Sequence, residues 1–229
     1  MRGRQLRFLR IGVSLLFFGT TSLLFLDFAG IVQPGASHGV LYPQFTPSLV
    51  RLLQGSLLAA SSLLFLLLLT LLWGRVFCSS ACPLGFLQDV LSRLAVVSTR
   101  PGGRRRFHYS RPRNRLRYGV LLAYLIGAVS GSVLLVGLLD PYGHFGRIIA
   151  LLVRPVVLIL TDLLAAVSTN LGSYVLPRMD LGPVAWSGAL LSLAFLGLLG
   201  VAAARRGRWF CNTLCPVGTI LGLLSRVSW

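Results

Sequence analysis

The chain of 229 residues lacks two of the commonest charged residue types, because it contains no lysine and no glutamate. All five acidic residues are aspartates, so the 22 arginines leave a net charge of +17. Only 12% of the residues are charged, 55% are hydrophobic, and the mean hydropathy is +0.80. This composition excludes an ordinary soluble domain and indicates a polytopic membrane protein.

The arginines lie in short clusters beside apolar runs, which is a pattern of membrane topology signals and argues against nucleic-acid binding. Of the 22 arginines, 18 lie before residue 11, from Arg75 to Arg117, or from Arg205 onward. The positive-inside rule then places the N-terminus, the Arg100–Arg117 loop and the C-terminus in the cytoplasm. We therefore expect a multi-pass protein with both termini cytoplasmic.

Four apolar runs are long enough to cross a bilayer, which takes about 20 residues. A fifth run, Ile148–Val167, carries Arg154, and a crossing there would turn the Arg205 cluster outward. We expect it to lie in the outer leaflet as an interfacial helix. The predicted fold is a single all-α integral membrane domain over residues 1–229, with two related halves at roughly 1–100 and 115–229. The four predicted transmembrane helices are Ile11–Val32, Leu49–Trp73, Tyr118–Leu139 and Pro183–Ala204.

Cysteine is also scarce, and all four cysteines fall in two copies of one dodecapeptide. The copies are Gly74–Gly85 and Gly207–Gly218, and they share the pattern Gly-Arg-x-Phe-Cys-x3-Cys-Pro-x-Gly. Each copy follows an apolar run, and both are predicted on the cytoplasmic face. Cysteines used only in matched pairs indicate metal ligands or redox thiols.

The second cysteine of each copy precedes a proline, which favours the first position of a helix. We therefore expect Cys82 and Cys215 at the N-caps of helices Pro83–Val97 and Pro216–Leu224. Helix N-termini lower a thiol pKa, so this position favours thiolates.

The other shared residues support the same interpretation. Arg75 and Arg208 place positive charge beside the cysteines, and Gly85 and Gly218 allow another backbone to approach one turn into each helix. Three chemistries remain open. They are a metal or iron–sulfur site, redox dithiols that exchange with a partner or reduce an ion such as copper, and structural zinc. The candidate ligands in every case are Cys78, Cys82, Cys211 and Cys215.

The duplicated motif resembles that of the membrane ferredoxin-type (NapH-like) 4Fe-4S electron-transfer family. The segment Leu139–Arg147 resembles a second family feature, an Asp-Pro turn that leads into an outer-face helix. The resemblance covers nearly the whole chain. It implies that the chain is a bacterial inner-membrane protein that relays electrons from the quinol pool to ferredoxin-like or other iron–sulfur partners. In such a role the chain could be the membrane subunit of a quinol dehydrogenase.

In the family, the motif cysteines, here Cys78, Cys82, Cys211 and Cys215, are associated with a 4Fe-4S centre, and Arg75 and Arg208 would lie beside it. Many members continue into a ferredoxin-like domain, whereas this chain ends at Trp229, so we expect that module to be a separate protein or the chain to be a fragment. The alternative function is a membrane thiol or copper reductase, or an assembly factor, without a cluster. No residue is predicted to be catalytic.

A few polar residues remain outside the motifs. His144 lies beside Asp140 and is a candidate for quinol contact, with a packed turn as the simpler alternative. Asp89 is expected to pair with Arg93 one helical turn later.

Overall fold

The computed structural model describes residues 2–27, 39, 42, 44–99, 114–170 and 185–226, and this part of the chain is helical without strands. The all-α prediction is therefore confirmed for the described residues. Residues 100–113 of the predicted cytoplasmic loop lie outside the described residues.

Within the described ranges, three helical segments are long and apolar enough to cross a membrane. The first is in α1 (Arg2–Leu26), where the apolar stretch is Phe8–Leu26. The second is Pro141–Ser168, and the third is α11 (Trp186–Arg206). The first and third agree with predicted spans, although α1 ends well before Val32.

The second predicted span, Leu49–Trp73, is wrong as a single helix. It is a hairpin of α3 (Phe45–Leu53) and α4 (Leu57–Trp73), which pack against each other. The turn contains Gly55 with φ of +86°, a left-handed conformation that glycine adopts without a steric penalty. Since α4 has 17 residues, it is about 26 Å long, slightly short of a hydrocarbon core of about 30 Å.

The third predicted span, Tyr118–Leu139, folds back in the same way. Helix α7 (Asn114–Val129) ends at a turn, and α8 (Val133–Leu139) packs against it. Gly131 has φ of +70°, and the Ser132 side chain accepts a hydrogen bond from the Leu135 backbone to cap α8. Both breaks occur at a Gly-Ser pair, which combines a residue free to turn with a residue that starts helices.

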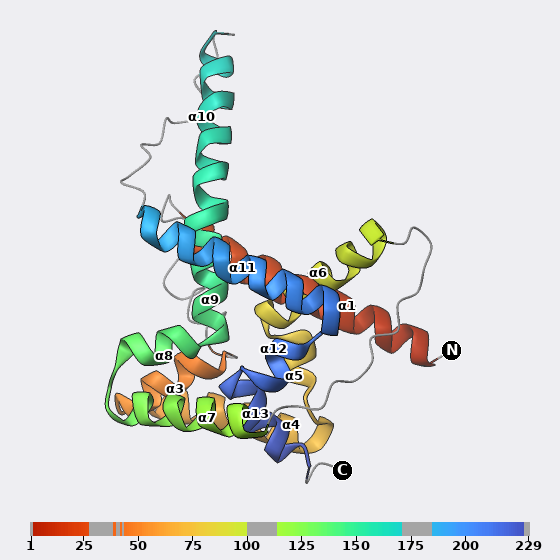
Figure 1. Ribbon diagram of the computed structural model, residues 1–229, viewed down its shortest axis with the longest axis vertical. Coiled ribbons are helices and arrows are strands. Elements are labelled where there is room, and N and C mark those ends of the chain that lie inside the picture. Colours follow the sequence, from red (N-terminus) through yellow and green to blue (C-terminus); the bar gives the residue numbers. More distant parts are fainter. Residues whose placement is uncertain are drawn as a thin grey trace.

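The fifth run, which we expected to be an interfacial helix, lies within a longer helical segment. It is part of a continuous helical segment formed by α9 (Pro141–Ile148), the π-helical turn η1 (Ile149–Val153) and α10 (Arg154–Asn170). This segment stands upright in Figure 1, whereas α1 and α11 slant across it. Both helices contact η1, so the crossing is a real packing arrangement.

The two cysteine motifs organise the remaining helices. The first motif contains α5 (Val76–Ser80) and leads into α6 (Pro83–Thr99). The second contains α12 (Trp209–Thr213) and leads into α13 (Pro216–Leu224). Packing is crosswise, because α6 lies against α11 while α13 lies against α4 and α7.

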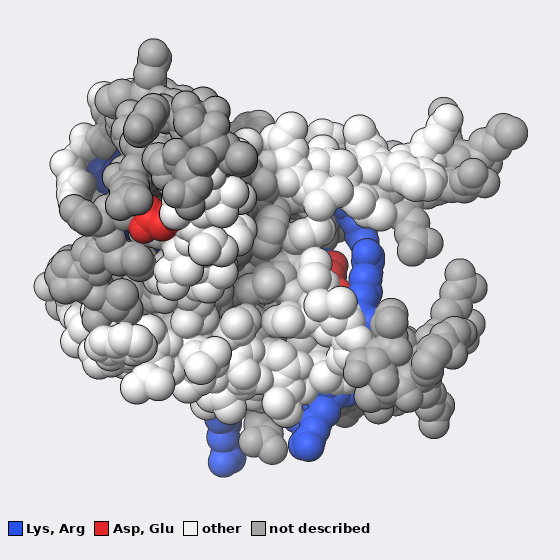
Figure 2. All heavy atoms as spheres, turned by 90° about the horizontal axis from the view of Figure 1, so that it is seen from above, with Lys and Arg blue, Asp and Glu red and all other residues white. Residues whose placement is uncertain are grey.

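Large apolar side chains cover much of the outside of the helices. Leu58 on α4, Leu134 on α8 and Leu191 on α11 are each more than 70% exposed. Figure 2 likewise shows that most of the visible described surface carries no charge. Such broad apolar exposure is typical of a lipid-facing protein and would be costly in water.

Candidate functional site

The two copies of the dodecapeptide adopt the same local backbone. Each preceding helix ends at a glycine with positive φ, +68° for Gly74 and +62° for Gly207. In each copy the amide of the second cysteine donates to the carbonyl of the motif phenylalanine at 3.0 Å. The repeated sequence is therefore also a repeated turn-helix-turn structure.

The second cysteine of each copy lies where a helix begins, as predicted. Cys215 is the N-cap of α13, and its Sγ accepts a hydrogen bond from the Gly218 amide at 3.2 Å. Cys82 directly precedes α6, and its thiol interacts with the amides of Leu84 and Gly85. These contacts orient both sulfurs by the free N–H groups of a first helical turn.

The last glycine of each motif makes the close backbone approach that the sequence predicted. A Cβ atom on Gly85 would lie 2.5 Å from the carbonyl oxygen of Cys78. A Cβ atom on Gly218 would collide in the same way with the carbonyl oxygen of Cys211. The glycines therefore let the turn that carries the first cysteine pack onto the helix that follows the second.

The crosswise packing brings the four thiols near one another. Each of the six pairs among Cys78, Cys82, Cys211 and Cys215 interacts electrostatically. None is in a disulfide, Cys215 is buried, and the other three are half-buried. Residues 129 to 137 positions apart in the sequence thus contribute to one cluster of thiols.

The predicted preference for thiolates is wrong for the protein without a cofactor. Burial is the largest influence on all four thiols, and it raises the pKa of Cys78 to about 12. The pKa values of Cys82, Cys211 and Cys215 are also raised by burial. The predicted opposing effects do exist, since Arg208 lowers the pKa of Cys78, Cys82 and Cys211, but they are smaller than desolvation.

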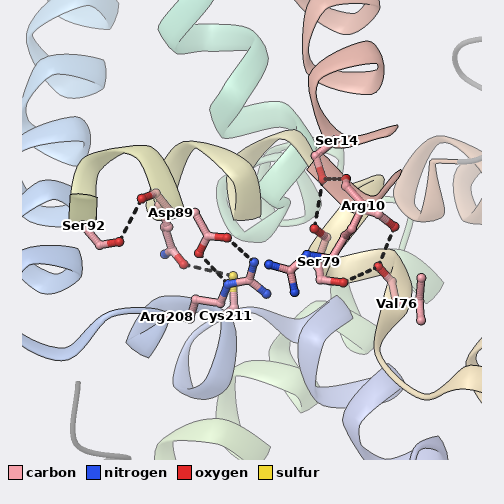
Figure 3. A network of polar contacts seen from close by, with 10 residues as sticks. Arg10, Ser14, Val76, Ser79, Asp89, Ser92, Arg208 and Cys211 are labelled. Carbon is pink, nitrogen blue, oxygen red and sulfur yellow. Dashed lines mark hydrogen bonds and ion pairs between the residues drawn. The ribbon is translucent and has the colours of Figure 1, made fainter. Parts of the chain in front are cut away.

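Arg208 forms an ion pair across the boundary between the two copies. Its Nε and Nη2 donate to Oδ1 and Oδ2 of Asp89 on α6, at 2.8 and 2.5 Å (Figure 3). This arrangement overturns the expected Asp89–Arg93 pair, because the aspartate is drawn toward α12 instead of along its own helix. The two-pronged geometry matches a guanidinium to a carboxylate and fixes both side chains.

Arg75 also reaches the opposite copy, but it finds a neutral group. Its Nη1 donates to the Oδ1 of Asn212 on α12 at 3.0 Å. A cavity of about 220 Å³ opens here, lined by Arg75, Cys78, Arg208, Cys211, Asn212 and Gly218. The predicted site residues Arg75 and Arg208 therefore both line the space beside the thiols.

Sequence reasoning missed two polar residues at this site. Gln88 is buried on α6, and its Oε1 accepts a hydrogen bond from the Cys211 thiol at 3.2 Å. Asn212 contacts Arg75 as described. Neither position is shared between the copies, which have Leu221 and Ser79 in the equivalent places, so the repeat gave no signal for them.

A second, larger cavity lies among α3, α7 and α8. Its volume is about 670 Å³, its lining is mainly apolar, and Thr46, Arg51 and Asp140 are among the polar residues at its wall. Asp140 caps α9 by accepting hydrogen bonds from the Tyr142 and Gly143 amides, and it interacts electrostatically with Cys82. Asp140 is thus both a wall residue of the cavity and a charged group that acts on a motif cysteine.

His144 does not line that cavity. Its Nε2 lies 2.7 Å from the carbonyl oxygen of Leu138, and its ring stacks on Phe195 at 3.9 Å between centroids. The simpler alternative from the sequence, a packed turn, describes these contacts better than a direct ligand contact.

In the described part of the chain the four thiols are not spaced as the ligands of a single metal ion. Four thiolates around one zinc ion would lie about 3.8 Å apart, given a Zn–S bond of about 2.3 Å. Among the described residues, no group of three or more His, Cys, Asp or Glu side chains has such spacing. A 4Fe-4S cluster differs from a single-ion site because it binds each of its four thiolates to a different iron atom.

Comparison with known proteins supports this cofactor. Residues 56–103 and 187–229 match the family model described as "4Fe-4S binding domain", and each matched segment contains one cysteine motif. The match indicates that the chain binds a 4Fe-4S cluster and supports a ferredoxin-type iron–sulfur family. No curated protein and no solved structure is detectably similar to the chain.

Proposed function

We propose that this protein relays electrons between the membrane quinol pool and iron–sulfur redox proteins through one centre at its cytoplasmic face. Cys78, Cys82, Cys211 and Cys215 hold a single 4Fe-4S cluster in this proposal, two from each motif. The observation that carries it is the mutual interaction of all four thiols. Two independent dithiol sites would not require the second copy to contact the first.

The bound cluster would accept and donate single electrons. The chain's own residues would set its surroundings. Arg75 and Arg208 would offset the negative charge of a thiolate-ligated cluster, and the amide of Gly218 would hydrogen-bond to the Cys215 sulfur.

The large cavity among α3, α7 and α8 is the proposed site for quinol. Its volume of about 670 Å³ is within the range of small-molecule pockets, and its mainly apolar wall suits a ring with a lipid tail. Asp140 provides a polar contact at the wall and interacts with Cys82 of the thiol cluster.

The arrangement of the helix ends supports the proposed topology. In Figure 1 the start of α1 and the end of α11, which carries Arg205 and Arg206, lie on the same side. The segment α9–η1–α10 crosses α1 and α11 steeply, so it does not share their direction. This geometry supports two related halves that cross the membrane, with Ile148–Val167 lying along it.

Reoxidation of the reduced centre by quinone tests the proposal. The protein is prepared anaerobically in lipid nanodiscs, reduced with dithionite and mixed with a short-chain quinone while its visible absorbance is followed. We expect rapid recovery of the oxidised spectrum. The variant Ala128→Trp should slow it at least tenfold, because the indole fills the cavity that Ala128 lines.

Leu122→Trp is the matched control, because Leu122 lies on the same helix, is 61% exposed and does not line the cavity. It should leave the rate unchanged. Equal rates in both variants would exclude this cavity as the quinone site. A reduced centre that quinone does not reoxidise even in the unsubstituted protein would refute the relay.

A further inference from the structure

The two motif arginines occupy equivalent positions but meet different surroundings. Arg208 is the counterpart of Arg75 in the repeat, and Gly222 is the counterpart of Asp89. Where Arg208 finds the Asp89 carboxylate, Arg75 therefore finds a residue without a side chain. One side of the thiol cluster is closed by the Arg208–Asp89 ion pair, and on the other side the described residues offer Arg75 a neutral amide instead of a carboxylate.

The guanidinium group of Arg117 also lies beside Gly222, next to that of Arg75. The position of a Cβ on Gly222 would be 3.6 Å from Cζ of Arg75 and 2.7 Å from Nη2 of Arg117. Arg117 is buried and donates to Thr219 Oγ1 and to the Thr219 carbonyl oxygen, both at 3.3 Å. Two guanidinium groups therefore converge at the position where the other copy of the motif provides a carboxylate.

Accessibility also differs between the two sides. Arg75 is exposed and lines the mouth of the 220 Å³ cavity together with Cys78, whereas Arg208 is half-buried against α6. Within the described part of the chain, the side chain of Arg75 makes one hydrogen bond, to the neutral amide of Asn212. An incoming carboxylate can therefore reach Arg75 from outside the protein.

We infer that the Arg75 side of this cavity is the docking site for an acidic iron–sulfur partner, which inserts a carboxylate against Arg75 in the way that Asp89 meets Arg208. This inference rests on the proposed function and specifies where the partner binds. An electron acceptor needs close approach to the centre, and the cavity places Cys78 and Cys211 beside the docking arginine. Charge complementarity would orient the partner and speed its association.

The test uses a chemically conservative change that supplies an internal carboxylate. Asn212→Asp keeps the size of the side chain and turns the Arg75 contact into an ion pair like that of Arg208. The holoprotein in nanodiscs is titrated with a small acidic ferredoxin whose cluster is replaced by a redox-silent gallium centre, so that binding is measured without electron transfer. We expect about three- to tenfold weaker binding at low salt, with the difference disappearing as salt screens the charges.

Three further variants separate docking from other roles. Arg75→Gln should weaken binding to a similar degree, because it removes the docking charge. Asn212→Ser, which installs the residue of the first copy, removes a hydrogen bond but leaves the charge, so binding should stay within twofold of the unsubstituted protein. Asp89→Asn acts on the closed side and should not weaken binding either. Iron and sulfide content is measured for every variant.

The binding measurements distinguish failure of the docking site from failure of the electron relay. Unchanged ferredoxin binding in both Asn212→Asp and Arg75→Gln would overturn the docking site, whatever their electron-transfer rates. So would weaker binding that appears only in variants that have lost iron. Conversely, charge-dependent binding to a protein whose centre quinone does not oxidise would leave the docking site standing and refute only the relay.

Discussion

The two copies of the cysteine motif share a backbone but differ in the charge around them. The glycine turns, the amide hydrogen bonds and the helix starts are the same in both. The second copy holds its arginine with Asp89, whereas the first copy holds Arg75 with Asn212. Backbone geometry is thus set by the shared residues, and the electrostatic character of each side by the residues that the copies do not share.

Loss of a cysteine should have the largest effect, and it should be equal in the two copies. Cys78→Ser and Cys215→Ser each remove one ligand of the proposed shared cluster. We expect both variants to lose their iron and their visible absorbance almost completely when purified without oxygen. Loss of half the iron in each variant would indicate that the copies bind metal separately.

The motif glycines should give the next largest effect, again in both copies. Gly85→Ala and Gly218→Ala each force a Cβ onto a backbone carbonyl, so we expect destabilisation of about 2 kcal/mol or more and loss of the cofactor. Thermal unfolding in detergent measures the change. Gly119→Ala is the control, because nothing lies within 4 Å of its Cβ position, and it should be neutral or slightly stabilising.

Substitution of the motif arginines Arg75 and Arg208 should change stability by different amounts in the two copies. Arg208→Gln removes a bidentate ion pair whose side chains are 32% and 27% exposed, and we expect a cost of about 1 kcal/mol after allowing for solvent screening. Arg75→Gln should cost less, since its partner is a neutral amide. Thermal unfolding at low and high salt compares them. Equal costs with equal salt dependence would show that the Asp89 pair adds nothing.

The smallest effect is expected from exchanging the residue that differs at the Arg75 contact. Asn212→Ser installs the counterpart residue Ser79 and deletes one exposed hydrogen bond, which is worth about 0.5 kcal/mol. Chemical denaturation of the purified protein resolves such a change. A cost above about 2 kcal/mol would mean that Asn212 supports the fold of the motif and does more than contact Arg75.

The sequence predicted the local structure of the site well. Cys-Pro gave the helix start at Pro216, and the Gly85 and Gly218 approaches followed from the missing side chains. Hydropathy alone could not locate the breaks at Gly55 and Gly131, because a hairpin of two apolar helices has the same composition as one long span. The direction of the thiol pKa shifts could not be predicted from the sequence either, because it depends on burial that only the assembled helices create.

Contacts between distant segments were the other limit. The pair Asp89–Arg93 satisfies the helical spacing, but the packing of α6 against α11 offers Asp89 the bidentate partner Arg208. A pattern within one helix cannot reveal a competing partner that lies 119 residues away. The same reason explains why Gln88 and Asn212 were missed.

The central claim is that the two copies share one cluster, and metal stoichiometry tests it most directly. The protein is purified without oxygen, and iron, acid-labile sulfide and zinc are quantified against protein by amino-acid analysis. We predict about four iron and four sulfide per chain and no stoichiometric zinc. One zinc ion per chain, or four free thiols with neither metal, would contradict the shared cluster.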